Sequence, residues 1–156
     1  MRSLALLVAA SCTDLGGAPP DAADAGVDVD PCAAEAGTGP MDAGLDGPSY
    51  RIDVESIFTR KCAMGGCHGT SNPALGMVLA EDVSWSHLVC VPSAAAPSLR
   101  RVVPSQPERS YLVNKLDGTH LDVGGMGRRM PLGQEPLSVL EMDLITGWIR
   151  AGARNN

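Results

Sequence analysis

From residue 50 onward, hydrophobic residues recur at helical spacings, first within residues 53–62 (DVESIFTRKC). Val54, Ile57 and Phe58 fall at positions i, i+3 and i+4, which predicts a short amphipathic helix that buries these three side chains. Asp53 is a suitable N-cap, because its carboxylate accepts hydrogen bonds from the free N–H groups of a first helical turn. Glycines and an Asn-Pro pair follow, and they predict irregular structure after this helix.

Two further amphipathic helices are predicted nearer the C-terminus. Residues 105–108 (SQPE) have the sequence of a capping box with proline in the first turn, and they precede the hydrophobic residues Tyr111, Leu112 and Leu116. Residues 138–141 (SVLE) form a second capping box, which opens the run of Leu140, Leu144, Ile145, Trp148 and Ile149. Gly152 then ends the helix. Residues 70–103 show no period that assigns them, so the prediction is a mainly α fold with long loops.

No hydrophobic period is present in residues 13–49, which consist largely of Asp, Ala, Gly and Pro. Such a segment buries too little apolar surface to offset the entropy lost when it is ordered. It contains eight acidic residues and no Lys or Arg, and its like charges repel one another and extend it. The chain therefore divides into a leader (1–11), an acidic, disordered tether (12–49) and a folded domain (50–156).

The charge of the chain is concentrated in this tether. The whole chain of 156 residues has a net charge of −6, whereas residues 50–156 hold ten acidic and eleven basic residues. A domain that is close to neutral and has no basic face is not expected to bind nucleic acid. The length is sufficient for one domain and an appendage.

The leader has the features of an export signal. Met1-Arg2-Ser3 provides a positive start, and a short apolar run follows that is much shorter than the roughly 20 residues needed to span a bilayer. The run ends in residues 9–12 (AASC), which resemble the lipobox of bacterial lipoproteins. In that family the cysteine, here Cys12, carries the lipid and becomes the mature N-terminus, so we expect a protein of the periplasm or cell envelope with a lipid anchor in a membrane. Secretion without a lipid is the alternative.

The segment KCAMGGCHG (61–69) places His68 directly after the second of two cysteines, Cys62 and Cys67. A c-type haem needs two thiols that add to its vinyl groups and a histidine that binds the iron immediately after the second thiol. The usual spacing has two residues between the cysteines, and this chain has four. The extra residues include two glycines and can loop out without separating Cys67 from His68.

Two other interpretations of the same motif remain open. A zinc ion needs four ligands, which Cys62, Cys67 and His68 would supply together with Cys90 or His87. An oxidising compartment disfavours free thiolates, and neighbouring Cys and His side chains usually point apart. The third interpretation is a disulfide between Cys62 and Cys67, with His68 on the surface.

A sixth ligand for a haem iron is available downstream. Met130 precedes a proline in a glycine-rich loop before the last predicted helix, and its thioether would give the His/Met ligation that raises the haem potential. Met126, Met77 and His120 are alternatives for this position, although none of them precedes a proline. Arg128 and Arg129 are candidates to neutralise haem propionates, or are surface charges beside the loop.

Several segments together resemble a class I cytochrome c domain. They are IF before the motif, CAMGGCHG, RVVPSQPERSYLVNKLDG, RRMPLG and PLSVLEMDLITGWIRAGA, and they span about residues 50–154. The resemblance is closest to the planctomycete-type and myxobacterial cytochrome c-like lipoproteins, here as a variant with four residues between the cysteines. Cys90, within LVCVPS, also departs from the family pattern.

The resemblance implies a role for each matching residue. Cys62 and Cys67 would form thioethers to one covalent haem c, with His68 and Met130 as the axial iron ligands. Phe58 and Trp148 match positions where the first and last helices of such domains cross. Once Cys12 is assigned to the lipid and two cysteines to haem, Cys32 and Cys90 remain; they form a disulfide or stay as separate thiols.

The predicted function is that of a monohaem c-type cytochrome that carries single electrons between redox partner proteins of the cell envelope. We expect a monomer that is not an enzyme, because Met130 would fill the sixth position; a peroxidase-like activity is expected only if that position is open. The alternative is a cell-envelope binding lipoprotein without haem, stabilised by a disulfide or by zinc. The sequence identifies neither the partners nor the redox potential.

Overall fold

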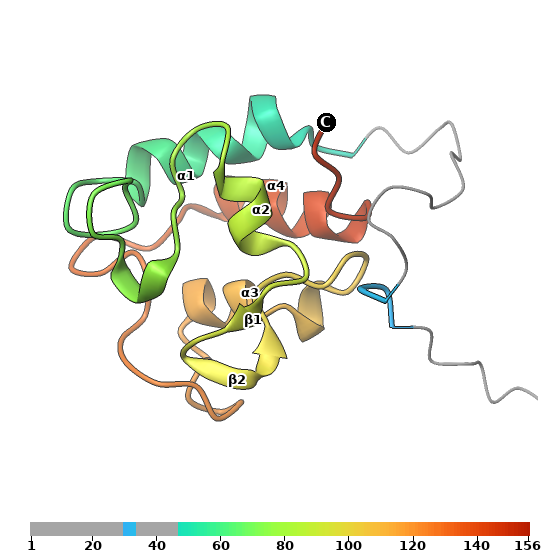
Figure 1. The fold of residues 1–156 in the computed structure, drawn as a ribbon. Coiled ribbons are helices and arrows are strands. Elements are labelled where there is room, and N and C mark those ends of the chain that lie inside the picture. The colour runs from blue at the N-terminus through green and yellow to red at the C-terminus, as the bar shows by residue number, and fades with distance from the viewer. Residues whose placement is uncertain (1–29, 34–46) are drawn as a thin grey trace, which may run out of the picture.

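A computed structural model describes residues 30–33 and 47–156 (Figure 1). The predicted leader, Cys12 and most of the tether lie outside these ranges. The elements of the domain, in chain order, are η1 (Tyr50–Val54), α1 (Glu55–Lys61), η2 (Ala74–Gly76), α2 (Ser84–Leu88), β1 (Pro92–Ser93), β2 (Ala96–Arg100), η3 (Pro107–Arg109), α3 (Tyr111–Asp117) and α4 (Val139–Arg150). No helix in the described ranges has the length and apolar character needed to span a membrane.

The prediction of a mainly α domain is confirmed only in part. Helices and long loops dominate the described residues, but β1 and β2 form a two-stranded antiparallel sheet that the sequence did not predict. The register pairs Pro92 with Arg100 and Ser93 with Ala96, and an irregularity lies between the two pairs. This sheet occupies part of the segment 70–103 for which the hydrophobic pattern gave no assignment, because strands of two and five residues are too short to show a period.

The first helix begins one turn earlier than predicted. The Ser49 hydroxyl accepts a hydrogen bond from the Ile52 N–H (3.4 Å), and an Asp53 carboxylate oxygen accepts one from the Ser49 N–H (2.8 Å). Asp53 therefore stabilises the start of the helix from inside its first turn, and its prediction as the N-cap was wrong. The predicted buried residues Val54, Ile57 and Phe58 are all buried.

The two predicted capping boxes have different outcomes. Ser138 and Glu141 form the predicted box, and α4 ends before Gly152, whose φ of 100° suits a glycine at a helix C-terminus. In residues 105–108 no side chain caps a helix, and a short 3₁₀ turn, η3, stands there instead. The helix α3 starts later, after Ser110, whose hydroxyl accepts from the Val103 N–H (2.9 Å) and donates to the Gln106 carbonyl (2.9 Å).

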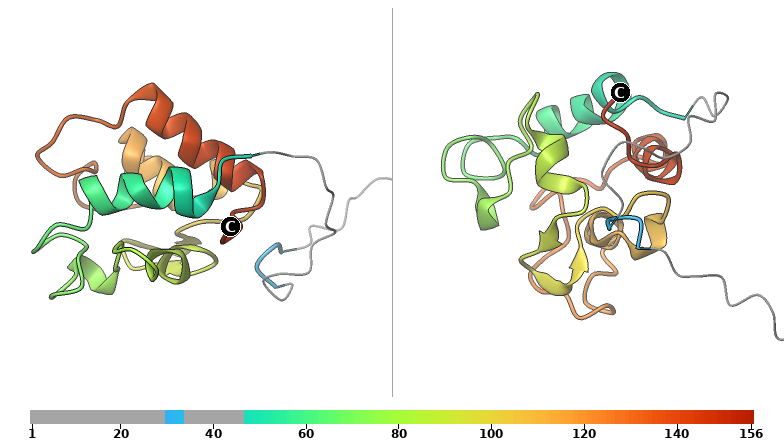
Figure 2. Two further views of the ribbon diagram at one scale, coloured as in Figure 1. Left: turned by 90° about the horizontal axis from the view of Figure 1, so that it is seen from above. Right: turned by 45° about the vertical axis from the view of Figure 1, so that its right-hand side comes forward.

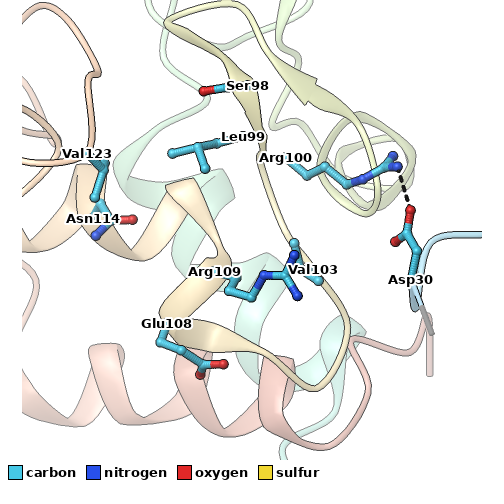
Figure 3. A pocket seen from close by; sticks show the side chains of 9 residues that line it. All are labelled: Asp30, Ser98, Leu99, Arg100, Val103, Glu108, Arg109, Asn114 and Val123. Carbon is cyan, nitrogen blue, oxygen red and sulfur yellow. Dashed lines mark hydrogen bonds and ion pairs between the residues drawn. The ribbon is translucent and has the colours of Figure 1, made fainter. Parts of the chain in front are cut away.

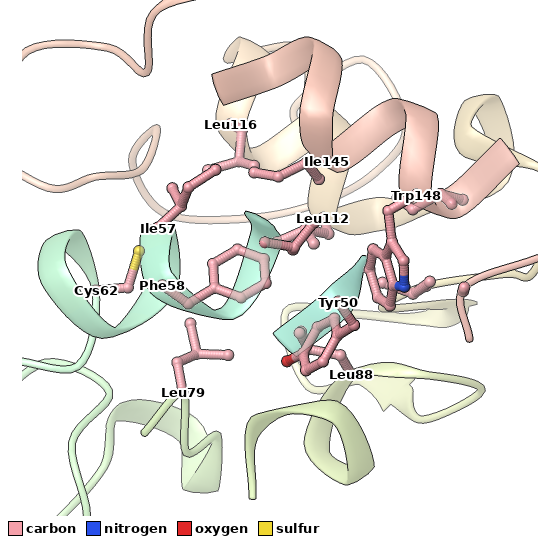
Figure 4. Packing of buried hydrophobic residues seen from close by; sticks show 14 of the residues in the cluster. Tyr50, Ile57, Phe58, Cys62, Leu79, Leu88, Leu112, Leu116, Ile145 and Trp148 are labelled. Atoms are coloured by element: carbon pink, nitrogen blue, oxygen red, sulfur yellow. The ribbon is translucent and has the colours of Figure 1, made fainter. Parts of the chain in front are cut away.

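The main hydrophobic core lies between η1, α1 and α4 (Figures 2 and 4). Tyr50 and Trp148 are fully buried, with ring centroids 4.8 Å apart, and Phe58 belongs to the same cluster. An added Cβ at Gly147 would come within 3.2 Å of the Pro48 ring, so a glycine in α4 allows the chain before η1 to pass closely. Phe58 and Trp148 thus belong to one core, and α4 contacts the first helical segment mainly at η1.

A buried polar network completes this side of the core. The Tyr50 hydroxyl donates to the Ser84 hydroxyl (2.7 Å), which donates in turn to the Glu55 carboxylate (2.8 Å). The same carboxylate oxygen accepts from the Asp82 N–H (2.9 Å) at the start of α2. Each buried polar group in the network has a partner, and the network joins η1 and α1 to α2.

A disulfide fastens a short piece of the N-terminal segment to the domain. Cys32 and Cys90 are bonded, with their Cα atoms 5.4 Å apart. Asp30 accepts a hydrogen bond from the Cys32 N–H (2.9 Å) and pairs with Arg100 (3.0 Å), and these two contacts, the first more than the second, hold the pKa of Asp30 below its ordinary value. Figure 3 shows the Asp30–Arg100 pair at the edge of a surface pocket. The blue segment 30–33 lies in Figure 1 at the end of the molecule opposite the loop that follows α1.

Candidate functional site

The loop after α1 brings Cys62 and His68 together. The His68 N–H donates to the Cys62 carbonyl (3.0 Å), and a turn closed by the Cys67 N–H and the Met64 carbonyl (3.0 Å) lies between them. Met64, Gly65 and Gly66 are exposed, and Gly66 has a φ of 78°. The additional residues between the cysteines therefore form an external bulge that leaves the two ends of the motif adjacent.

Gly69 fixes the exit of this loop. An added Cβ at Gly69 would lie 2.7 Å from the Ala63 carbonyl oxygen, which is closer than real side chains approach. A glycine is therefore required for the chain to pass back beneath the loop and bury His68. The Leu79 N–H then donates to the His68 carbonyl (2.7 Å) and ties the returning segment to the motif.

The His68 ring is oriented and neutral. Its Nδ1 lies 3.1 Å from the Met77 carbonyl oxygen, and because a carbonyl only accepts, Nδ1 carries the proton. His68 is 8% exposed, and burial lowers the pKa of its imidazole. The neutral tautomer has a lone pair on Nε2, and no residue in the described ranges hydrogen-bonds this nitrogen. These are the properties of a histidine that binds a metal through Nε2.

His68 and Met130 lie on the wall of one cavity. Its other lining residues are mostly apolar and come from the loops and from α2 and α3; they include Leu75, Met77, Leu88, Ala95 and Leu112. The cavity has a volume of ≈ 80 Å³ and opens to solvent. His68 and Met130, which are 62 positions apart in the sequence, thus line the same apolar cavity.

Met130 reaches this cavity because its backbone is attached to α3. The Met130 N–H donates to the Lys115 carbonyl (3.0 Å), and the side chain packs on the main core. Of the alternative sixth ligands, Met77 also lines the cavity, whereas Met126 is 60% exposed and lies away from it. His120 is buried and its Nε2 contacts the Gly127 carbonyl (3.0 Å), so its ring faces the glycine-rich loop.

Cys62 and Cys67 are free thiols, and neither lines the cavity. Burial, and next the neighbouring Cys67, raise the pKa of Cys62 to about 11, so this sulfur is a protonated thiol at neutral pH. No disulfide joins the two cysteines in the structure. The interpretation of the motif as a Cys62–Cys67 disulfide therefore finds no support in the geometry.

The predicted zinc site is not assembled with Cys90. Cys90 is bonded to Cys32 and has no thiolate to offer a metal. His87 is part of α2, and its carbonyl accepts a hydrogen bond from Arg101 (2.6 Å). Within residues 30–33 and 47–156, no three His, Cys, Asp or Glu side chains are grouped so as to hold a metal ion.

Two basic residues that the sequence did not single out line the cavity, namely Arg101 and Lys115. Burial lowers the pKa of both side chains. The predicted pair Arg128 and Arg129 does not line the cavity; Arg128 is exposed, and Arg129 lies over Gly118. No local pattern distinguishes Arg101 or Lys115, because each reaches the cavity through the tertiary fold.

Tyr111 contributes a buried hydroxyl that has no partner. The residue is 4% exposed, its side chain lines the cavity, and its hydroxyl makes no hydrogen bond within the described residues. The same holds for Nδ1 of His120. An added Cβ at Gly125 would collide with the Tyr111 hydroxyl, so the glycine-rich loop lies directly over this oxygen. Buried polar atoms without partners are costly, so both atoms are expected to bind a water molecule or another polar group.

Comparison of the chain with known protein families, with curated proteins and with solved structures finds no match. The chemistry of the site therefore rests on its own residues. They are a neutral histidine with a free Nε2, a methionine on the same cavity, two free thiols in the motif, and basic groups and an unpartnered hydroxyl in the cavity lining.

Proposed function

We propose that this protein is a monohaem c-type cytochrome that carries single electrons in the bacterial cell envelope. The observation that carries the proposal is that His68 and Met130 line one apolar cavity, with the Nε2 lone pair of a neutral His68 free. A nitrogen and a thioether sulfur facing one space suit the two axial positions of a haem iron. The resemblance of the motif and of the final helix to class I cytochromes c supports the same assignment.

The chemistry of the residues around the cavity suits a haem. The cavity itself is too small to hold one unless its walls move. The cavity of ≈ 80 Å³ is smaller than the roughly 300–1,000 Å³ of pockets that hold cofactors. A haem therefore enters only if the loops on either side of the cavity move outward. Leu75, which lines the cavity, is 66% exposed and has a positive φ of 51°, and Met126 in the glycine-rich loop is 60% exposed.

Each residue of the site has one role in this proposal. Cys62 and Cys67 would attach the porphyrin as thioethers, and the carbonyl of Met77 holds Nδ1 of His68 and leaves Nε2 available for the iron. Met130 would occupy the sixth position and exclude small ligands such as peroxide, which makes the protein a carrier and not an enzyme. The haem supplies a centre that is reversibly oxidised and reduced by one electron.

The disulfide and the leader support a setting in the cell envelope. Disulfides persist in oxidising compartments, so the Cys32–Cys90 bond supports export. We propose lipidation at Cys12, anchorage to a membrane of the envelope, and electron exchange by a monomer with redox proteins. The alternative is a haem-free binding lipoprotein for which the same disulfide provides stability.

Intact-mass spectrometry of the full chain, produced with and without a c-type haem maturation system, tests the attachment. The expected result is a mass increase of one haem that persists in denaturant and maps to the peptide containing Cys62 and Cys67. An unchanged mass in both hosts would reject the haem and leave the binding lipoprotein. A zinc assay on the same sample then separates the metal-stabilised form of that alternative from the disulfide-stabilised one.

The Met130→Ala variant tests the sixth ligand. Oxidised protein with a methionine–iron bond has a weak near-infrared absorption band, which should disappear in this variant. Met126→Ala is the matched control, because Met126 lies in the same loop and away from the cavity. If Met77→Ala removes the band and Met130→Ala does not, the ligand assignment is wrong while the haem remains.

A further inference from the structure

A second pocket lies on the surface beside the segment that the disulfide fastens, and β2, η3 and α3 contribute its other walls (Figure 3). It has a volume of ≈ 330 Å³, which is within the range of roughly 300–1,000 Å³ that is usual for pockets that hold small molecules. We call it the Asp30 pocket, after the residue that the segment 30–33 contributes to its lining. None of its lining residues also lines the cavity between His68 and Met130.

Positive and negative side chains are present in equal number in the Asp30 pocket. Its charged lining residues are Arg100, Arg109, Asp30 and Glu108. Asp30 and Arg100 form an ion pair (3.0 Å), so these two charges neutralise each other. The Arg109 guanidinium donates to the Gln106 side-chain oxygen (2.9 Å) and keeps its full positive charge, because this acceptor is neutral. The Glu108 carboxylate has no hydrogen bond or ion pair within the described residues. The pocket therefore presents one further charge of each sign to a ligand.

The pocket also provides apolar contacts and a neutral acceptor. Val103 is buried and Leu99 is half-buried, and Figure 3 shows Leu99 between Asn114 on one side and Arg100 on the other. The Asn114 amide nitrogen donates to the Thr119 hydroxyl (3.2 Å), which leaves the amide oxygen as an acceptor. An ammonium group has only donors, so the Glu108 carboxylate and the Asn114 oxygen both suit it.

We infer that the Asp30 pocket binds a small zwitterion with an apolar side chain, that is, an α-amino acid or a short peptide with free termini. Its carboxylate pairs with Arg109 and its ammonium with Glu108, and its side chain covers Leu99. A ligand with only one of the two charges leaves either Arg109 or Glu108 without a counter-charge. The inference goes beyond the proposed function and does not depend on it, because the two sites share no lining residue.

Amide chemical-shift titration of the full chain by NMR tests this site, because it detects weak binding and locates it. The probes are L-leucine and L-leucyl-L-leucine, which separate an amino acid from a short peptide. Two analogues are compared with L-leucine: N-acetyl-L-leucine has no ammonium group, and L-leucinamide has no carboxylate. At least one zwitterion should shift the amide signals of residues 98–100 and 108–109. Each analogue should bind about fivefold more weakly than its zwitterionic parent, since solvent screens ion pairs at an open pocket.

Two charge-removing variants should each abolish one of these differences. Glu108→Gln should bind L-leucine and N-acetyl-L-leucine equally, and Arg109→Gln should bind L-leucine and L-leucinamide equally. Glu135→Gln is the matched control, because Glu135 is exposed and lines neither site. A general effect of a substitution on the fold would change the affinity for every probe, whereas the inference requires a change that is specific to one analogue.

Asp30→Asn tests the contribution of the fastened segment. The substitution removes the charge that neutralises Arg100, so the pocket gains a net positive charge. N-acetyl-L-leucine should then bind more tightly relative to L-leucine than it does in the unmodified protein. An unchanged ratio of the two affinities would contradict the assigned role of the Asp30–Arg100 pair.

The outcomes are distinguishable from those of the haem experiments. Equal affinities for the zwitterions and both analogues, or no shifts at residues 98–100 and 108–109, overturn the inference and leave the cytochrome assignment untouched. Selective binding of a zwitterion by a protein that attaches no haem supports the pocket and rejects the cytochrome. Shifts that are confined to the cavity between His68 and Met130 also overturn the inference, since they place the zwitterion at the other site.

Discussion

Tyr50 and Tyr111 are both buried, and they differ in what surrounds their hydroxyl groups. The Tyr50 hydroxyl belongs to a continuous network with Ser84 and Glu55, and its ring packs on Trp148 in a filled core. The Tyr111 hydroxyl has no partner within the described residues and lies beside a cavity. On one side of the molecule the buried tyrosine hydroxyl has hydrogen-bond partners, and on the other side it has none among the described residues.

This difference distinguishes residues that are stabilised by contacts within the chain from residues that lack such contacts and would be stabilised by another molecule. The side formed by η1, α1 and α4 has satisfied polar groups and close packing, so its residues are explained by the fold. On the cavity side, Nε2 of His68 and the Tyr111 hydroxyl have no hydrogen-bond partner within the described residues. Under the proposed function, a haem iron would bind this Nε2 and the Met130 thioether.

The largest expected difference in stability is between truncation of a side chain in the core and truncation of one beside the cavity. Trp148→Ala should lower the free energy of unfolding of the haem-free protein by about 3–5 kcal/mol, because it removes a fully buried ring. Met130→Ala should cost less than about 2 kcal/mol, since Met130 is only partly buried and already borders empty space. Urea unfolding followed by far-UV circular dichroism measures both. Similar costs would mean that the cavity side is as tightly packed as the core.

Removal of the disulfide should give the next largest effect. Cys32 and Cys90 are separated by 58 residues, and a cross-link over such a loop stabilises by about 2–4 kcal/mol. Thermal unfolding of the Cys32→Ser/Cys90→Ser double variant measures the loss, and reductant should destabilise the unmodified protein similarly while leaving the variant unaffected. The haem spectrum should not change. A lost haem signal would show that the fastened segment is part of the site.

Hydroxyl removal compares the two tyrosines directly. Tyr50→Phe should destabilise the haem-free protein by about 1 kcal/mol, because Ser84 loses a donor. Tyr111→Phe should leave its stability unchanged or raise it slightly, since the deleted oxygen had no hydrogen bond to lose. Equilibrium urea denaturation of both variants provides the test. Destabilisation by both substitutions to the same extent would place an unrecognised partner on Tyr111.

The smallest expected effect concerns the ion pair that joins the motif to α4. Lys61, directly before Cys62, bonds the Glu141 carboxylate (2.9 Å); this bond and the Ser138 N–H hold the pKa of Glu141 below its ordinary value of 4.5. A lowered carboxyl pKa stabilises the fold above pH 4.5, and the stabilisation is lost as the pH falls through the folded-state pKa.

Glu141→Gln should therefore cost a few tenths of a kcal/mol at pH 7, since partly exposed ion pairs are screened by solvent, and the difference from the unmodified protein should shrink below pH 4.5. Unfolding midpoints measured from pH 3 to 7 supply the comparison. A difference that is independent of pH would assign the effect to the Ser138 cap instead of the charge.

Local patterns were sufficient to predict α1, α4 and its capping box, because each depends on neighbours within a few residues. They failed at residues 105–108, where the SQPE sequence forms a 3₁₀ turn and Ser110 bonds back to Val103. The short strands were missed as well, because two and five residues give no period.

The residues of the candidate site also divide into those that a local sequence pattern selected and those that only the tertiary structure reveals. The motif identified Cys62, Cys67 and His68 from adjacency alone, and Met130 was selected from its position before a proline. The distinction between Met130 and Met126 depends on the hydrogen bond to Lys115, which is a tertiary contact. Arg101, Tyr111 and Lys115 reach the cavity only through the packing of α3 and the segment before it, so no local signal marks them.

The central claim, that the cavity between His68 and Met130 holds a covalent haem, is tested most directly by an absorption spectrum. The full chain would be produced with c-type haem maturation, measured after oxidation, and measured again after reduction with dithionite. The account predicts a red protein with sharp bands in the reduced state, and a His68→Ala variant in which those bands are lost or strongly altered. A colourless protein from a host that matures other c-type cytochromes would contradict it.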